Sequence, residues 1–118
     1  MALSDKQAGA CLKAVGAFLE KKRPPVHIRD QLDYRADITG SALTIVKVRP
    51  AFDDKSRKIE HPVAKAKWVA TRDVWRLFWM RADSADMKWH SYTPKPEAKS
   101  ISALLSEVDR DLHGCFFG

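Results

Sequence analysis

Glycine and cysteine are scarce in this sequence, and each scarcity argues against particular kinds of functional site. Only five glycines occur in 118 residues and they do not cluster, which excludes a glycine-rich phosphate-cradling loop. The two cysteines, Cys11 and Cys115, lie near opposite ends of the chain and form no CxxC pair. This arrangement gives no support to redox chemistry or zinc binding, and we expect two reduced thiols.

Long apolar runs are also missing. No stretch reaches the roughly 20 apolar residues that cross a bilayer, and residues 1–5 lack the basic start and apolar core of a signal peptide. We therefore expect a cytoplasmic protein with no membrane contact. At 118 residues, the chain fits one domain spanning 1–118.

Positive charge is in excess. Lys and Arg number 21 against 15 Asp and Glu, a net charge of +6, which favours an anionic partner such as nucleic acid or another polyanion. Hydrophobic residues make up 45% of the chain, and four Trp and five Phe supply large apolar surfaces. We expect a core built around aromatic side chains.

Two helices are predicted at the ends of the chain. Ser4 and Gln7 form a capping box before an apolar stripe of helical spacing, and Pro24-Pro25 forbids continuation, which gives a helix over 5–22. A second stripe after Ser100 gives a helix over 101–112 that Gly114 stops.

Five strands are predicted between the helices, because polar and apolar residues alternate there. The expected fold is α+β, an antiparallel five-stranded β-meander with both helices packed on one face. The predicted strands cover residues 31–38, 42–49, 63–71, 74–82 and 87–92.

The third and fourth predicted strands form a hairpin around Arg72-Asp73. In that register Ala66 lies opposite Trp79 and Ala70 lies opposite Trp75, so that small residues make room for indoles. We expect both indoles to be largely buried under the helices, with Trp68 beside them.

Several motifs along the chain resemble those of a bacterial family known only as domain of unknown function 3024. These motifs are Lys22-Arg23-Pro24-Pro25 with His27-Ile28-Arg29, Val48-Arg49-Pro50, residues 59–66, residues 71–76, residues 81–83, Lys88-Trp89-His90 with Tyr92, and residues 114–118. The resemblance implies no activity, cofactor or catalytic residue. The sequence departs from the family pattern at Ser84-Ala85-Asp86, which lengthen a turn and leave open which face His90 occupies.

One sheet face is a candidate polyanion-binding surface. Cationic and aromatic side chains alternate on it, so that phosphates would pair with cations while bases stack on rings. Its residues are Lys65, Lys67, Arg76, Lys88, His90 and Tyr92. The alternative is a solvent-facing surface that only keeps the protein in solution.

A second cluster follows the first helix and consists of Arg23, His27, Arg29 and Asp33. These residues form either an anion or enzyme site, or a local brace of ion pairs. For metal, the potential ligands His61, His90, His113 and Cys115 include only one close pair, so we expect no metal and no cofactor.

Three functions remain open from the sequence. We favour a non-catalytic binding module for nucleic acid or another polyanion, with no catalytic residue. The alternatives are a small enzyme that uses His27, Arg29 and Asp33, and an accessory domain that binds protein through a sheet edge or Phe116-Phe117. Partner identity and oligomeric state stay undetermined.

Overall fold

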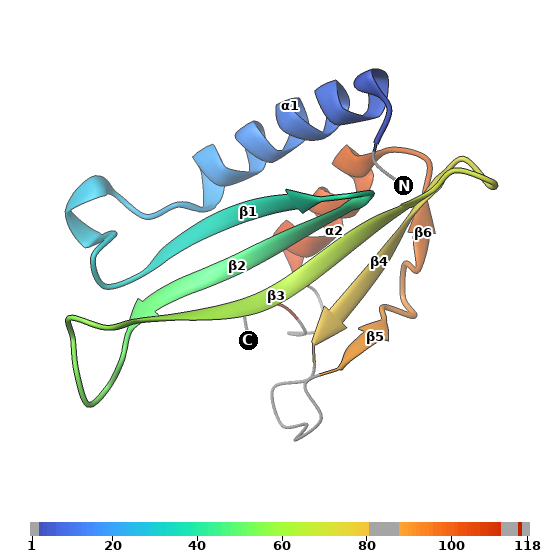
Figure 1. Cartoon of the computed structure of the whole chain (residues 1–118). Coiled ribbons are helices and arrows are strands. Elements are labelled where there is room, and N and C mark those ends of the chain that lie inside the picture. Colours follow the sequence, from blue (N-terminus) through green and yellow to red (C-terminus); the bar gives the residue numbers. More distant parts are fainter. Residues whose placement is uncertain (1–2, 81–87, 112–115, 117–118) are drawn as a thin grey trace.

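The computed structural model describes residues 3–80, 88–111 and 116 of the chain. They form an α+β fold with an antiparallel sheet whose strands follow in the order β1-β2-β3-β4-β5, as the sequence predicts (Figure 1). The elements are α1 (Asp5–Lys22), the 3-10 helix η1 (Val26–Ile28), β1 (Asp33–Thr39), β2 (Ala42–Pro50), β3 (Lys58–Val69), β4 (Val74–Met80), β5 (Trp89–Ser91), β6 (Glu97–Ala98) and α2 (Ile101–Arg110).

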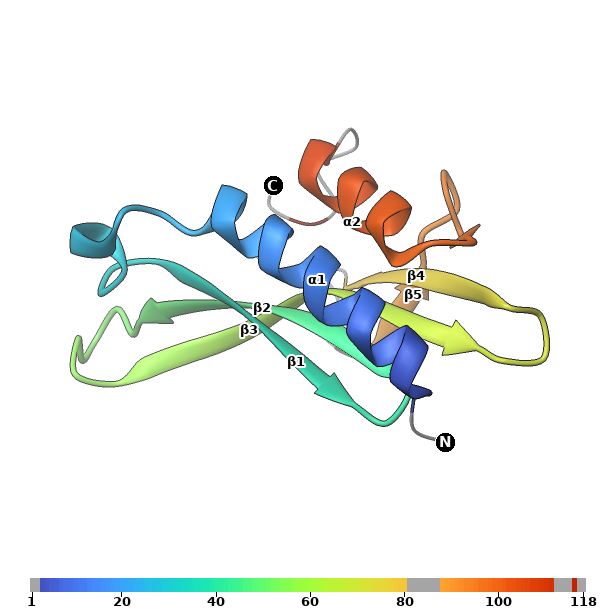
Figure 2. The ribbon, with the colours of Figure 1, turned by 90° about the horizontal axis from the view of Figure 1, so that it is seen from above.

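The two helices lie side by side on one face of the sheet (Figures 1 and 2). No described helix covers the opposite face, which we call the open face. The long β2–β3 hairpin projects past the helices, and the principal extents of the molecule are 46, 30 and 27 Å. The fold is therefore two layers with one sheet surface available for contact.

The ends of α1 follow from its sequence. The Ser4 hydroxyl accepts a hydrogen bond from the Gln7 amide at 3.3 Å, which caps the first turn. Lys21 and Lys22 occupy the last turn, where the helix dipole favours cations. Both lysines also pair with Asp109 of α2, at 3.2 and 3.3 Å, which ties the two helices together.

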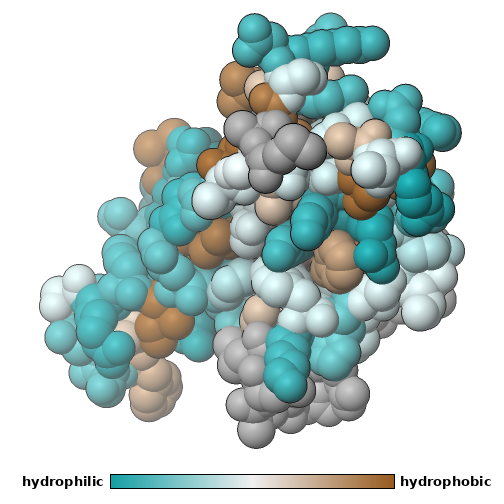
Figure 3. Space-filling model, turned by 45° about the vertical axis from the view of Figure 1, so that its right-hand side comes forward, coloured by the Kyte–Doolittle hydropathy of each residue, from teal (hydrophilic) through white to brown (hydrophobic). Residues whose placement is uncertain are grey.

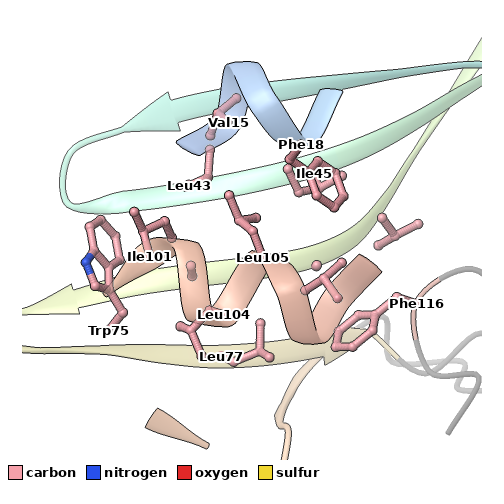
Figure 4. Packing of buried hydrophobic residues seen from close by; sticks show 14 of the residues in the cluster. Val15, Phe18, Leu43, Ile45, Trp75, Leu77, Ile101, Leu104, Leu105 and Phe116 are labelled. Atoms are coloured by element: carbon pink, nitrogen blue, oxygen red, sulfur yellow. The ribbon is translucent and has the colours of Figure 1, made fainter. Parts of the chain in front are cut away.

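The core lies between the helices and the sheet. Trp75 is 1% exposed at its centre, and the Trp68 ring packs beside it with centroids 5.3 Å apart. Trp79 is only partly buried, against the edge of the cluster. Figure 4 shows how side chains of both helices meet those of the sheet; the labelled members are Val15, Phe18, Leu43, Ile45, Trp75, Leu77, Ile101, Leu104, Leu105 and Phe116. Cys11 is also buried in this core as a free thiol, as expected, whereas Cys115 lies outside the described residues.

The β3–β4 register differs from the predicted one by two residues. Ala64 pairs with Trp79 and Trp68 with Trp75, because the strands are joined by a four-residue loop, 70–73. Arg72-Asp73 lacks the glycine that a two-residue turn prefers, and Asp73 itself takes a left-handed conformation with φ of 53°. A shift of two residues leaves every side chain on its predicted face.

Strand β3 begins five residues before its predicted start and contains Pro62. Proline lacks the amide that a central strand needs. Here Pro62 lies opposite Val46 at a β-bulge, where the register shifts and Val63 is the extra residue. The bulge therefore accommodates the proline, and a segment predicted as loop becomes part of the longest strand.

Strand β5 is out of its predicted register by one residue. His90 pairs with Trp79 and Ser91 with Phe78, whereas the predicted binding surface assumes that Arg81 pairs with Met87, which would place His90 opposite Phe78. A one-residue slip turns every side chain to the other face. The short strand β6, which also pairs with β4, was not predicted, because Pro94 and Pro96 flank its approach. The turn at Ser84–Asp86 lies outside the described residues.

The second helix ends earlier than predicted. Asp111, in a left-handed conformation with φ of 44°, caps α2 after Arg110. Leu112 and Gly114, which the sequence assigned to the end of this helix, lie outside the described residues. At its start, the Ser100 hydroxyl accepts a hydrogen bond from the Ala103 amide at 3.2 Å, as expected.

Candidate nucleic-acid interface

Three cations of the predicted site stand together on the open face. Lys65 and Lys67 of β3 lie on the same side as Arg76 of β4, and Lys67 and Arg76 are direct cross-strand partners. We call these three residues, with the aromatic side chains Phe78 and Trp89, the basic patch.

The rings of the basic patch lie between its charges. The Arg76 guanidinium stands 5.2 Å from the centroid of the Phe78 ring, and the Lys65 ammonium stands 6.0 Å from that of Trp89. Such cation–π contacts hold the long side chains over the sheet without neutralising them. The patch therefore presents oriented positive charge beside partly exposed aromatic surface.

Carboxylates of the described residues do not neutralise the patch. No ion pair with Lys65, Lys67 or Arg76 occurs among them. Glu97 is the β6 partner of Arg76, but its carboxylate pairs with Arg72. Like charges directly opposite each other destabilise a sheet, so the pairing of Lys67 with Arg76 costs stability in the absence of an anion.

Two of the other three predicted residues, Tyr92 and His90, lie on the opposite side of the sheet from this patch. Tyr92 is fully buried on the helix side, with its ring centroid 4.9 Å from that of Phe116. The His90 ring packs against Trp79 on the same side, with centroids 5.9 Å apart. Lys88 precedes β5 and is exposed. The prediction that His90 and Tyr92 share the face of Lys65 is therefore wrong, because of the one-residue slip in β5.

Trp89 takes the place that the sequence gave to Tyr92. The alternation in residues 88–92 puts an aromatic ring on each face, so the pattern alone favours neither register. A register fixed by the Met80–Trp89 pairing would have identified Trp89.

An ionic cluster occupies the open face beside the patch. Arg35 donates two hydrogen bonds of 2.9 Å to Asp37 and also pairs with Glu60. The hydrogen bond from Arg35 holds the pKa of the Glu60 carboxyl below its ordinary value. One arginine faces two carboxylates here, so the cluster carries a net charge of −1, and the positive charge of the open face lies at β3 and β4.

The second predicted cluster is a brace between α1 and β1. Arg23 donates two hydrogen bonds of 2.8 Å to the Asp33 carboxylate, in the bidentate geometry that arginine favours. This pairing, together with the Tyr34 amide, holds the pKa of Asp33 below its ordinary value. A carboxylate held ionised in this way is poorly suited to act as a general base.

The remaining members of that cluster form no hydrogen bond with the pair, although the charge of Arg29 helps to lower the pKa of Asp33. Arg29 donates to the Pro24 carbonyl at 2.9 Å, and the His27 side chain is exposed on η1. An open hollow of about 500 Å³ adjoins Arg23, Arg29 and Asp33. The geometry is that of the predicted local brace rather than of a site with converging acid and base groups.

Comparisons with known proteins give one match. A family model described as domain of unknown function, DUF3024, matches residues 3–118. The chain belongs to this family. No curated protein and no solved structure matches the chain.

The described part of this DUF3024 chain offers little support for a metal site, a membrane-spanning helix or a protein-binding tail. No group of three His, Cys, Asp or Glu side chains is placed to hold a metal ion there. No described helix is long and apolar enough to cross a membrane. Phe116, proposed as part of a protein-binding tail, is buried against Tyr92, while His113, Cys115 and Phe117 lie outside the described residues.

The surface of this DUF3024 chain is mostly hydrophilic on the face that Figure 3 presents. Hydrophobic residues appear there in small, separate areas. Scattered apolar residues are ordinary on a protein surface. The charged features, above all the basic patch, therefore distinguish the molecule.

Proposed function

We propose that this DUF3024 chain is a non-catalytic module that binds nucleic acid through the basic patch on its open face. The observation that carries the proposal is the cross-strand pair of Lys67 and Arg76, two like charges with which no described carboxylate forms an ion pair. A phosphate between them would relieve their repulsion, because each cation would then face an anion.

The surroundings of this pair support nucleic acid over other polyanions. The Phe78 ring centroid lies 5.2 Å from the Arg76 guanidinium, and that of Trp89 lies 6.0 Å from the Lys65 ammonium. Nucleic-acid bases stack on such rings, whereas other polyanions have no flat group to place there.

We further propose that the module works in the bacterial cytoplasm. The buried, free thiol of Cys11 supports this compartment, because thiols remain reduced in the cytosol. Burial raises the pKa of Cys11, which keeps it protonated and unreactive.

The proposal is tested by the salt dependence of binding. We expect the affinity for a single-stranded or duplex oligonucleotide to fall steeply with salt concentration, and the double variant Lys65→Ala, Lys67→Ala to flatten the logarithmic slope by about two units. Fluorescence anisotropy of a labelled oligonucleotide at several salt concentrations measures this slope.

A matched control separates the patch from net charge. The double variant Lys6→Ala, Lys13→Ala removes the same charge from exposed positions of α1. We expect it to keep the wild-type slope. Equal loss in both double variants would reduce the effect to net charge, and failure of the wild type to bind would overturn the function.

A further inference from the structure

The tip of the β2–β3 hairpin combines an exposed ring with uncompensated positive charge. Phe52 is 99% exposed, the most exposed of the large hydrophobic side chains described. Residues 47–58 carry five cations and two carboxylates. A single exposed phenyl group is ordinary on a protein surface. The charges around Phe52 therefore decide whether the ring marks a binding site.

The carboxylates next to Phe52 are engaged inside the loop. Asp53 pairs with Arg57 at 2.8 Å. Asp54 accepts hydrogen bonds from the Ser56 hydroxyl and amide, at 2.6 and 3.0 Å. The positive charges of Arg49, Lys55 and Lys58 are therefore left without a carboxylate partner among the described residues.

The loop is ordered by its own hydrogen bonds. The Ala51 amide donates to the Arg57 carbonyl at 2.8 Å, and the Ala51 side chain is buried. Lys58 donates to the Asp30 carbonyl at 2.6 Å, which anchors the loop to the turn before β1. Phe52 is thus presented by a closed loop, and its exposure follows from the loop's geometry.

An open hollow lies beside the ring. It has a volume of about 740 Å³ between the loop and the turn at Asp30 and Gln31, and Arg49, Lys55 and Lys58 line it together with Phe52. Figure 1 shows the loop descending from the sheet on the side away from the helices.

We propose that this tip is a second contact site for single-stranded nucleic acid, in which an unpaired base stacks on Phe52 while Arg49, Lys55 and Lys58 contact the flanking phosphates. That the partner is nucleic acid rests on the proposed function. The new element is that this partner is single-stranded. An exposed phenyl ring accepts a base only when the base is unstacked, as in single strands.

A membrane surface fits the tip less well. Insertion of Phe52 would bring the adjacent Asp53 and Asp54 carboxylates into an anionic headgroup layer. Stacking requires only one face of the ring and leaves both carboxylates in water. We therefore commit to the single strand and keep the membrane as an outcome of the test.

The tip and the basic patch lie far enough apart to require a long ligand. Lys65 lies seven positions after Lys58 in β3, which corresponds to roughly 23 Å along a strand. The probe is therefore an unstructured polythymidine of about 20 nucleotides, longer than a single-site footprint, with a duplex of equal length for comparison.

The decisive variant is Phe52→Ala, which does not disturb the core because the side chain is solvent-exposed. We expect it to weaken polythymidine binding roughly 5- to 150-fold, as loss of one stacked base does, and to leave duplex binding unchanged. Phe52→Trp should retain the wild-type affinity. Leu12→Ala, which removes another exposed apolar side chain, on α1, should have no effect.

The outcomes separate the two proposals. Equal polythymidine binding by Phe52→Ala and wild type, with a loss in the Lys65→Ala, Lys67→Ala variant, overturns the tip and keeps the patch. Failure of the wild type to bind any oligonucleotide overturns both. Phe52-dependent binding to vesicles of phosphatidylserine and phosphatidylcholine, without an effect on polythymidine, overturns the tip as a nucleic-acid site.

Discussion

Among single residues, Arg23 and Asp33 show how a charged pair fixes the chain after α1. Arg23 caps the end of the helix, and its amide donates to the Leu19 carbonyl at 2.8 Å. Its side chain then holds Asp33 at the first position of β1. The pair therefore sets where the chain enters the sheet, although nine residues lie between its two members.

This pair predicts a pH-dependent stability. The pKa of Asp33 lies below its reference value of 3.8 in the folded state, first because of the hydrogen bond from Arg23. A lowered pKa stabilises the fold above the reference value, and the contribution is lost as pH falls through the folded value. We expect Asp33→Asn to cost about 1 kcal/mol at neutral pH and progressively less as the pH falls below the reference value of 3.8.

Urea unfolding followed by tryptophan fluorescence at several pH values measures this difference. Asp30→Asn is the control, because it removes an exposed carboxylate that forms no ion pair with the described residues. It should cost little at every pH. A difference between wild type and Asp33→Asn that stays constant with pH would contradict the explanation.

The sequence contained the members of this cluster but not their pairing. Two arginines, a histidine and an aspartate after a helix are compatible with an anion site and with a brace. The choice depends on which atoms meet in three dimensions. Arg29 turns to the Pro24 carbonyl and leaves Arg23 to Asp33, an outcome that composition does not encode.

Among the elements, the β1–β2 hairpin depends on Gly40. Thr39 pairs with Ala42 across a two-residue loop, and Gly40 has φ of 60° while Ser41 stays at negative φ. This pattern fits a type II′ turn, which requires glycine at its first central position. Side chains at that position are strained in the left-handed region.

We expect Gly40→Ala to lower the free energy of unfolding by about 1–2 kcal/mol. Chemical denaturation measures the change. Gly9→Ala is the matched control, because Gly9 lies in α1 with open space around its Cα, and it should stabilise the helix by up to about 1 kcal/mol. Equal effects of both substitutions would show that the turn is not the cause.

The strands also show where the sequence determines structure and where it does not. Alternation in residues 63–69 and 74–80 assigned the faces of β3 and β4 correctly, because an error of two residues preserves them. In β5 both faces carry an aromatic ring, so no hydrophobic preference opposed a slip of one. Because of that ambiguity, the predicted binding surface wrongly included His90 and Tyr92.

For the whole molecule, stability centres on Trp75. Its side chain is almost completely buried between the sheet and the helices, while Trp79 lies at the margin of the core. A large cavity at the centre of a domain this small removes a large share of its stability. Trp75 and Trp79, both tryptophans of β4, therefore contribute unequally to the free energy of unfolding.

We expect Trp75→Ala to cost about 3–5 kcal/mol and Trp79→Ala to cost less. Thermal and urea unfolding by circular dichroism compare the two variants. Arg76→Ala, between them on the same strand, removes the repulsion with Lys67 and should not lower stability. A larger loss in Trp79→Ala than in Trp75→Ala would place the centre of the core elsewhere.

The edges of the sheet bear on how the protein behaves at high concentration. An exposed strand edge invites another chain to add to it, which leads to aggregation. Here β1, at one edge, alternates the charged residues Asp33, Arg35 and Asp37, and β5, at the other, is only three residues long. Both features discourage sheet-to-sheet growth, so the molecule can keep one face of its sheet uncovered without assembling into fibres.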